Sequence, residues 1–193
     1  GNLWDMLLEA GEKYGLTPCG LAARDSLRTG AVLPLSHQDI GDWPFQNNPW
    51  TFALPLNSDK TGFTKDFVGA KALLQTGEES YTYPFIGYDP RKIEAGENSA
   101  VFSRAEKIGR VLTCTTDMGI GRHQDSVYSL TSPDRPSAFK PRGLCCGFMQ
   151  VERPLEYNQE VELQDPKRGI NVLVTENIRP DRTARKNFFP DSE

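Results

Sequence analysis

Residues 159–175 read Gln159-Glu-Val-Glu-Leu-Gln-Asp-Pro-Lys-Arg-Gly-Ile-Asn-Val-Leu-Val-Thr175, and this stretch decides the fold class. Apolar and polar residues alternate on both sides of Gln164-Asp-Pro-Lys-Arg-Gly169, which predicts two strands joined by a hairpin-type loop. In the second strand Ile170, Val172 and Val174 fall on one face, as expected for a strand with one side on a core. The C-terminal part is therefore predicted to be built from short strands.

The same pattern of short strands and turn clusters extends upstream as far as Tyr81. Because several strands follow one another at this spacing, the region is predicted to form an all-β sandwich or barrel. The turns also account for a Gly and Pro content of 17 and 14 residues. The further strands that the pattern predicts are Tyr81–Tyr88, Ser99–Ser103, Ile108–Thr115, Ser126–Thr131 and Gly143–Val151.

The residues before Tyr81 follow a different pattern. A helix is predicted over 2–14, with Asn2 as a possible N-cap and Gly15 just past its end. A second helix is predicted over 66–75, whereas residues 36–64 are rich in Asn, Asp, Gly, Pro and Trp and are predicted to be irregular, with only Trp50–Leu56 strand-like.

The segment Leu21–Arg28 is predicted to contain a short helix. Arg24 and Arg28 then lie on one face at i,i+4 spacing. Like charges at that spacing repel one another, so each arginine is expected to have its own anionic partner.

Composition excludes several classes of protein. The 193 residues carry 22 Lys and Arg against 26 Asp and Glu, a net charge of −4, which argues against a nucleic-acid-coating role. No stretch approaches the roughly 20 apolar residues of a membrane-spanning helix, and no secretory signal is present at the start. The chain begins at Gly1 and enters a helical pattern at once, so it is expected to be a fragment.

The cysteines are expected to be reduced and mostly buried, as in a cytoplasmic protein. No C-x-x-C spacing occurs, so neither zinc nor thioredoxin-type chemistry is indicated. Cys145 and Cys146 are neighbours, and if the segment is a strand their thiols point to opposite faces.

Motifs for other chemistries are incomplete. Gly119-Ile-Gly121 lacks the third glycine of a dinucleotide-binding loop. His37 and Asp39 are two donors without a third, so no metal site is predicted. The basic tail, in which Arg179 is followed by Arg182, Arg185 and Lys186, is either a solvated terminus or an anion clamp.

Several segments, in order along the chain, resemble the aminomethyltransferase family, whose type member is the glycine cleavage system T-protein. Gly20-Leu-Ala-Ala-Arg-Asp-Ser-Leu-Arg28 is similar to the family signature G-L-[GA]-A-R-D-x-L-R. Asp66-Phe-Val-Gly69 and Lys107-Ile-Gly-Arg-Val111 resemble two further family motifs, and Phe188-Phe189 resembles its closing P-F.

The resemblance implies that this chain is the C-terminal half of a longer protein. The implied fold class is α+β, with a partial N-terminal α/β segment followed by a distorted Greek-key or jelly-roll β-barrel of the T-protein type. The implied division is 1–80, a remnant of the folate-binding α+β region, and 81–193, the barrel domain.

The resemblance also implies a function. The family moves a one-carbon (aminomethyl) unit from a lipoyl carrier protein to tetrahydrofolate, and its catalytic residues lie in the other half, so this fragment alone is expected to be inactive. The implied partners are a folate and a lipoyl carrier, with no nucleic acid and no membrane. Two alternatives remain: a non-enzymatic folate-binding relative, and a diverged interaction module.

The family's cofactor-binding residues map onto few positions here. Arg24 matches the signature arginine that lines the folate pocket, with a salt bridge to Asp25 or another acid as the alternative, and Arg28 is a second candidate. The chain departs from the family pattern at three positions. Gly30 replaces a glutamate, Ser36 replaces a tyrosine, and Tyr81 or Thr82 stands where an arginine is expected.

Overall fold

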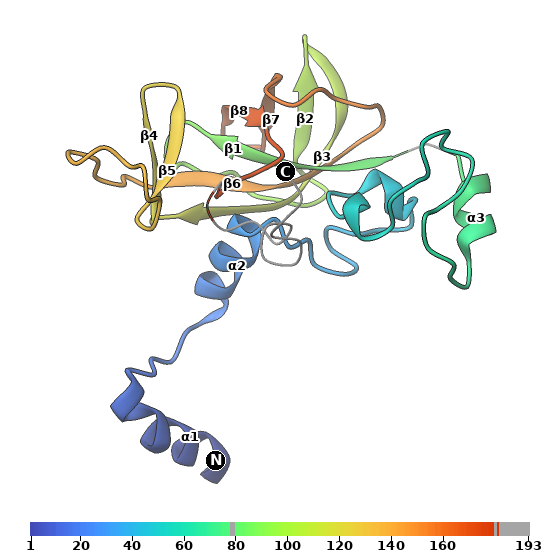
Figure 1. The fold of residues 1–193 in the computed structure, drawn as a ribbon. Coiled ribbons are helices and arrows are strands. Elements are labelled where there is room, and N and C mark those ends of the chain that lie inside the picture. The colour runs from blue at the N-terminus through green and yellow to red at the C-terminus, as the bar shows by residue number, and fades with distance from the viewer. Residues whose placement is uncertain (78–79, 180, 182–193) are drawn as a thin grey trace.

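The computed structural model describes residues 1–77, 80–179 and 181, and it combines a helical N-terminal part with a β-barrel (Figure 1). In the described residues the N-terminal part holds three α-helices and three short 3-10 helices. The α-helices are α1 (Asn2–Gly11), α2 (Leu21–Gly30) and α3 (Ala70–Gln75), and the 3-10 helices are η1 (Glu12–Tyr14), η2 (Phe45–Asn47) and η3 (Thr51–Ala53).

Six antiparallel strands close into a barrel in the order β1-β6-β3-β2-β7-β8, in which β8 pairs back onto β1. Of the barrel strands that follow one another along the chain, β2 and β3, β3 and β6, and β7 and β8 are paired, whereas β1 is separated from β2 and β6 from β7. The barrel strands are β1 (Tyr81–Gly87), β2 (Ala100–Ser103), β3 (Glu106–Asp117), β6 (Leu144–Val151), β7 (Glu160–Gln164) and β8 (Gly169–Val174). A separate two-stranded hairpin consists of β4 (Ile120–His123) and β5 (Ser126–Ser129).

The strand predictions are confirmed for all seven segments, to within a few residues at each end. The predicted hairpin forms with Gln164 opposite Gly169, and Asp165 N–H donates to the carbonyl of Arg168 (2.9 Å) across the turn. Strand β4 was not predicted, because Ile120–His123 is short and carries only one large apolar residue. The α+β fold class with a closed β-barrel is confirmed.

Two apolar clusters pack on the two faces of the barrel wall. Phe85, Val111 and Met149 belong to the interior cluster, whereas Ile86, Leu112 and Phe148 belong to a cluster on the outer face. The interior cluster is continued by the buried residues of β2, β7 and β8, and the outer one by Val32, Ile120 and Ile178. The wall formed by β1, β3 and β6 is thus covered on both sides.

Strand β6 is buried on both faces, which explains its nearly continuous apolar sequence. Cys145 lies in the interior cluster and Cys146 in the outer one, so the prediction that their thiols face opposite ways is confirmed. Gly147, between these cysteines and Phe148, marks a close approach: a Cβ there would lie 1.8 Å from the carbonyl oxygen of Thr113. Only glycine therefore fits at this point of the β3–β6 pairing.

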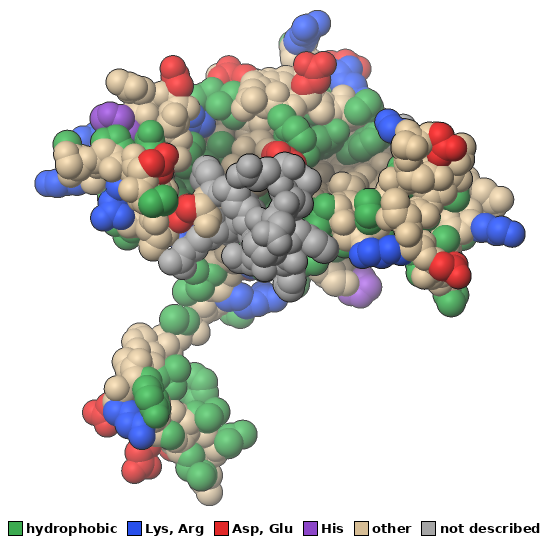
Figure 2. Space-filling model, viewed as in Figure 1, with side chains coloured by type: hydrophobic (Ala, Val, Ile, Leu, Met, Phe, Trp, Pro, Cys, Tyr) green, Lys and Arg blue, Asp and Glu red, His purple; other side chains and the backbone are tan. Residues whose placement is uncertain are grey.

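Helix α1 extends away from the barrel (Figure 1), and none of its residues is buried. The predicted helix over 2–14 is confirmed as α1 and η1, and Gly15 ends it in the left-handed conformation (φ 70°). The prediction of Asn2 as N-cap is wrong, because Gly1 occupies the cap position and no side chain caps the helix. The apolar stripe of α1, which includes Leu3 and Leu7, is exposed (Figure 2).

Two predictions for the residues between 50 and 75 are corrected. Trp50–Leu56 contains η3 and a single bridge from Leu56 to Phe63, not a strand, because aromatic and turn-forming residues curl the chain locally. Helix α3 begins at Ala70 and not at 66, since Gly69 enters the left-handed region (φ 97°), where a helix cannot continue. No helix within the described residues is long and apolar enough to cross a membrane.

Candidate functional site

Helix α2 places Arg28 against strand β3, where it meets a fully buried aspartate. Arg28 Nη1 lies 2.6 Å from Asp39 Oδ2, and Arg28 Nε lies 2.8 Å from Asp25 Oδ1 one turn earlier on the helix. Asp39 is 0% exposed and Arg28 is 8% exposed. The positive and negative charges are therefore held together away from water, where each charge is stabilised by its partner.

Thr113 on β3 completes this cluster, which we call the Arg28 cluster (Asp25, Arg28, Gln38, Asp39 and Thr113). The Thr113 hydroxyl donates to Asp39 Oδ1 (2.6 Å) and accepts from Arg28 Nη2 (3.2 Å) and Gln38 Nε2 (2.7 Å). All five side chains are thus linked by hydrogen bonds. The cluster fixes α2 and the loop after it to the barrel.

The electrostatics of Arg28 follow from this arrangement. Burial lowers the pKa of its guanidinium, but the hydrogen bonds and charges of Asp25 and Asp39 raise it by more, so the pKa lies above its usual value. Arg28 therefore remains a permanent cation in the protein interior. Its N–H groups contact Asp25, Asp39, Thr113 and the carbonyl of Leu33, so its role in this structure is to join parts of the fold.

A pocket of about 530 Å³ lies beside the Arg28 cluster, where the irregular loop meets the start of β1. Trp43 forms one wall, and its indole N–H donates to the hydroxyl of Thr82 (3.0 Å), which itself donates to the backbone carbonyl of Asp39 (2.7 Å). The polar residues of the lining are His37, Gln38, Asp42, Thr76, Ser80 and Arg110. An aromatic wall with polar groups around it suits a planar polar ligand.

Arg24 does not line this pocket. Its side chain is 52% exposed, and its Nη1 lies 3.7 Å from Asp25 Oδ1, the salt bridge that the sequence offered as the alternative reading. The expectation of a separate anionic partner for each arginine is met only by Arg28 with Asp39, because Asp25 is shared. The two candidate cofactor-binding arginines therefore differ: Arg28 points inward to the cluster, and Arg24 remains accessible.

A second buried ion pair joins the end of β3 to Arg179. Arg179 Nε and Nη2 lie 2.5 and 2.6 Å from the two carboxylate oxygens of Asp117, which is 1% exposed. This hydrogen bonding raises the pKa of the Arg179 guanidinium above its usual value. The solvated-terminus interpretation is therefore wrong for Arg179; the rest of that basic tail (Arg182, Arg185 and Lys186) and Phe188-Phe189 lie outside the described residues.

This ion pair also gives a physical account of Gly30. A Cβ on Gly30 would lie 3.0 Å from Arg179 Nε and 3.3 Å from Asp117 Oδ2, and Arg179 N–H donates to the Gly30 carbonyl (3.2 Å). A side chain at position 30 would press on the pair. Thr82, one of the two positions in place of an expected arginine, is buried and joins Trp43 to the backbone of Asp39.

Asp39 is the residue of this region whose role the sequence did not predict. The sequence placed it beside His37 as an incomplete metal site, but its carboxylate accepts from Arg28, Thr113 and the backbone N–H of Leu35. Within the ranges that the structure describes, no group of three or more His, Cys, Asp or Glu residues could hold a metal ion. Arg28 lies 11 residues from Asp39 along the chain and Thr113 lies 74 residues from it, so the spacing of the residues could not predict these contacts.

No family model matches the chain. Among curated proteins, the chain is 44% identical over 91 residues to the aminomethyltransferase of Symbiobacterium thermophilum, covering 45% of this chain and 22% of that protein. It is 38% identical over 115 residues to the aminomethyltransferase of Alkaliphilus metalliredigens, covering 58% of this chain and 30% of that protein. It is 31% identical over 130 residues to the probable aminomethyltransferase of Pyrococcus horikoshii, covering 62% and 32%.

The fold is also similar to that of a solved structure. The crystal structure of glycine cleavage system aminomethyltransferase T from Bartonella henselae matches with a TM-score of 0.61 and 24% identity, over 94% of this chain and 44% of that chain. The matches to the three curated proteins span only about a fifth to a third of their length (22%, 30% and 32%). The sequence matches confirm the predicted resemblance: this chain is similar to proteins named aminomethyltransferase, and a C-terminal portion is consistent with the matches.

Proposed function

We propose that this chain is the C-terminal portion of a folate-dependent one-carbon transferase of the aminomethyltransferase type. The observation that carries the proposal is the sequence relation, which reaches 44% identity over 91 residues to a protein named aminomethyltransferase. The whole protein then transfers an aminomethyl-derived carbon from a lipoyl carrier protein to tetrahydrofolate. The 193-residue chain by itself is inactive, because the catalytic residues belong to the other part of the protein.

Arg24 is the residue we propose for contact with the folate. A guanidinium has five N–H donors in a fixed plane, and Arg24 has a long 3.7 Å contact to Asp25 while half of its side chain is exposed. It therefore has donors available for the carboxylate or ring oxygens of a folate, which fits the proposed cofactor. Arg28 fits less well, since its donors already contact the Arg28 cluster.

Binding of 5-formyltetrahydrofolate, measured by isothermal titration calorimetry on the full-length protein, tests the proposal. Arg24→Ala should weaken binding by about 1–3 kcal/mol, because a charged hydrogen bond to the ligand is lost. Arg153→Ala is the matched control: Arg153 is similarly exposed and pairs with Glu106 on the barrel, so affinity should stay unchanged.

The outcomes separate the three readings of the sequence. Saturable binding together with aminomethyltransferase activity supports the proposal, and saturable binding without activity supports the non-enzymatic folate-binding relative. Absence of saturable binding would leave the interaction module and refute the proposal. An unchanged affinity in a folded Arg24→Ala protein would remove Arg24 from the site.

A further inference from the structure

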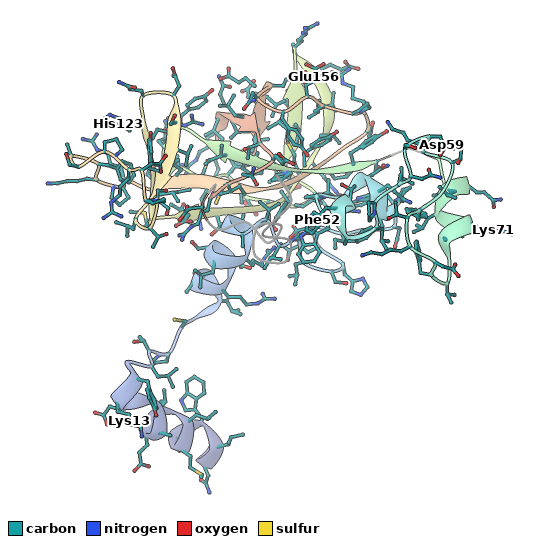
Figure 3. All side chains as sticks on the ribbon, viewed as in Figure 1. Lys13, Phe52, Asp59, Lys71, His123 and Glu156 are labelled. Atoms are coloured by element: carbon teal, nitrogen blue, oxygen red, sulfur yellow. The ribbon has the colours of Figure 1, made fainter. Side chains whose placement is uncertain are left out.

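A second pocket of about 530 Å³ lies at the other end of the barrel wall, between the β4–β5 hairpin and the loop that leads into β6. It does not share residues with the pocket beside the Arg28 cluster. His123, labelled in Figure 3, lies at its edge at the end of β4. Figure 2 shows Lys and Arg side chains gathered over this end of the molecule. The pocket has the size of a small-molecule site.

The charge in this pocket is positive. Arg122, Lys140 and Arg142 line it, and Asp89 is the acidic residue among the lining side chains. Asp89 is already neutralised by Arg91, whose Nε and Nη2 lie 2.9 and 2.6 Å from Asp89 Oδ2. An anion entering the pocket therefore meets three cations and no uncompensated carboxylate.

Arg122 is held in place and keeps one donor without a partner. Its guanidinium carbon lies 4.7 Å from the centre of the Tyr88 ring, and its Nε donates to the carbonyl of Gly87 (3.3 Å). Its Nη2 is buried, and the described residues offer it no hydrogen-bond partner. A buried unsatisfied donor costs free energy, so the contacts within the described residues leave the Arg122 guanidinium incompletely satisfied.

The walls of the pocket are aromatic and closely packed. Phe139 lies on the Tyr128 ring with the ring centres 5.7 Å apart, and Tyr88 forms the opposite aromatic surface beneath Arg122. A Cβ on Gly121 would lie 3.2 Å from Pro141 Cα, so the loop packs directly on β4. The loop is thereby fixed against the hairpin, and the pocket is preformed.

We propose that this pocket binds a phosphate monoester that carries an aromatic ring, the class to which nucleoside monophosphates belong. The phosphate pairs with the guanidinium groups of Arg122 and Arg142 and attracts Lys140, because planar guanidinium groups suit phosphate oxygens. The ring packs against Phe139, because the Arg122 guanidinium covers one face of Tyr88. This site is independent of the folate contact proposed for Arg24.

Isothermal titration calorimetry with adenosine monophosphate as the probe tests the proposal. Saturable binding is expected for the wild-type protein, with much weaker binding of adenosine, which lacks the phosphate, and of inorganic phosphate, which lacks the ring. Arg122→Gln should raise the Kd at least about tenfold, because a charge-assisted hydrogen bond is lost. Lys140→Ala, an exposed loop position, should raise it by a smaller factor without affecting the fold.

Arg104→Ala is the control, because Arg104 is an exposed arginine in the β2–β3 turn and its loss removes the same charge away from the pocket. An equal loss of affinity in Arg104→Ala would show nonspecific attraction and overturn the proposal. So would the absence of saturable binding, or an unchanged Kd in both folded pocket variants. Equal affinity for inorganic phosphate and adenosine monophosphate would overturn the role of the ring.

Discussion

Replacing Asp39 by asparagine tests whether the Arg28 cluster holds the helical part on the barrel. Asp39→Asn keeps the size of the side chain but removes its charge and converts one oxygen into an NH₂ donor. In the native protein the two oxygens accept from Arg28 Nη1 at 2.6 Å, Thr113 Oγ1 at 2.6 Å and Leu35 N–H at 2.8 Å. The new amide nitrogen must face one of these donors.

The expected cost follows from burial. Asp39 is 0% exposed, so its loss leaves the Arg28 guanidinium buried beside a neutral group. Removing one partner of a buried ion pair typically costs about 3–5 kcal/mol. Arg28 keeps its contact with Asp25, which is partly exposed, so we expect a loss of about 3 kcal/mol, at the lower end of this range.

Urea unfolding followed by tryptophan fluorescence measures this loss as a lower midpoint at unchanged slope. Asp66→Asn is the matched control, because Asp66 is an exposed carboxylate, and its midpoint should not move. The double variant Arg28→Met/Asp39→Leu should be more stable than Asp39→Asn, since no unpaired charge remains buried. A loss below about 1 kcal/mol in Asp39→Asn, or a less stable double variant, would refute the reasoning.

Two further predictions concern strand β6 and the thiols. Gly147→Ala should lower the free energy of unfolding by at least about 2 kcal/mol in the same urea assay, because the new methyl group meets the β3 main chain. Gly77→Ala is the control and should be close to neutral, because a Cβ at Gly77 has no atom within 4 Å. Ellman's reagent should label Cys19, which is exposed, in the native protein. It should reach Cys145 and Cys146 only after unfolding, because burial excludes the reagent from both thiols and raises the pKa of Cys146. Labelling of Cys146 in the native protein would contradict the burial of the outer face of β6.

The barrel could be predicted from the sequence because apolar and polar residues alternate along most of its strands. The hairpin of β7 and β8 follows from period-2 patterning, and the opposite orientation of Cys145 and Cys146 in β6 follows from the geometry of any strand. The order of the strands in the barrel did not follow, since pairing of β6 with both β1 and β3 depends on contacts between distant segments. Residues 36–64 escaped prediction beyond their irregularity, because turns there depend on local side-chain hydrogen bonds that have no period.

The candidate site was also predicted only in part from the sequence. The signature containing Arg24 and Arg28 was visible as a motif. The motif did not predict that Arg28 is buried and Arg24 exposed, because i,i+4 spacing places both side chains on the same face of the helix. Their difference is set by Asp39, a loop residue beyond the helix, whose burial depends on Thr113 of the barrel.

Gly30 is a departure from the family pattern that has a physical account in this structure. Because Arg179 returns from the end of β8 to pair with Asp117, its guanidinium occupies the space where a side chain at position 30 would lie. Arg28 Nη2 donates to Thr113 of β3 (3.2 Å), and Arg179, which pairs with Asp117 of β3, donates its backbone N–H to the Gly30 carbonyl (3.2 Å). These contacts together fix the C-terminal end of α2 to β3. A helix fixed at this end holds Arg24, one turn before Arg28, in a defined position, and the proposed folate contact requires that fixed position.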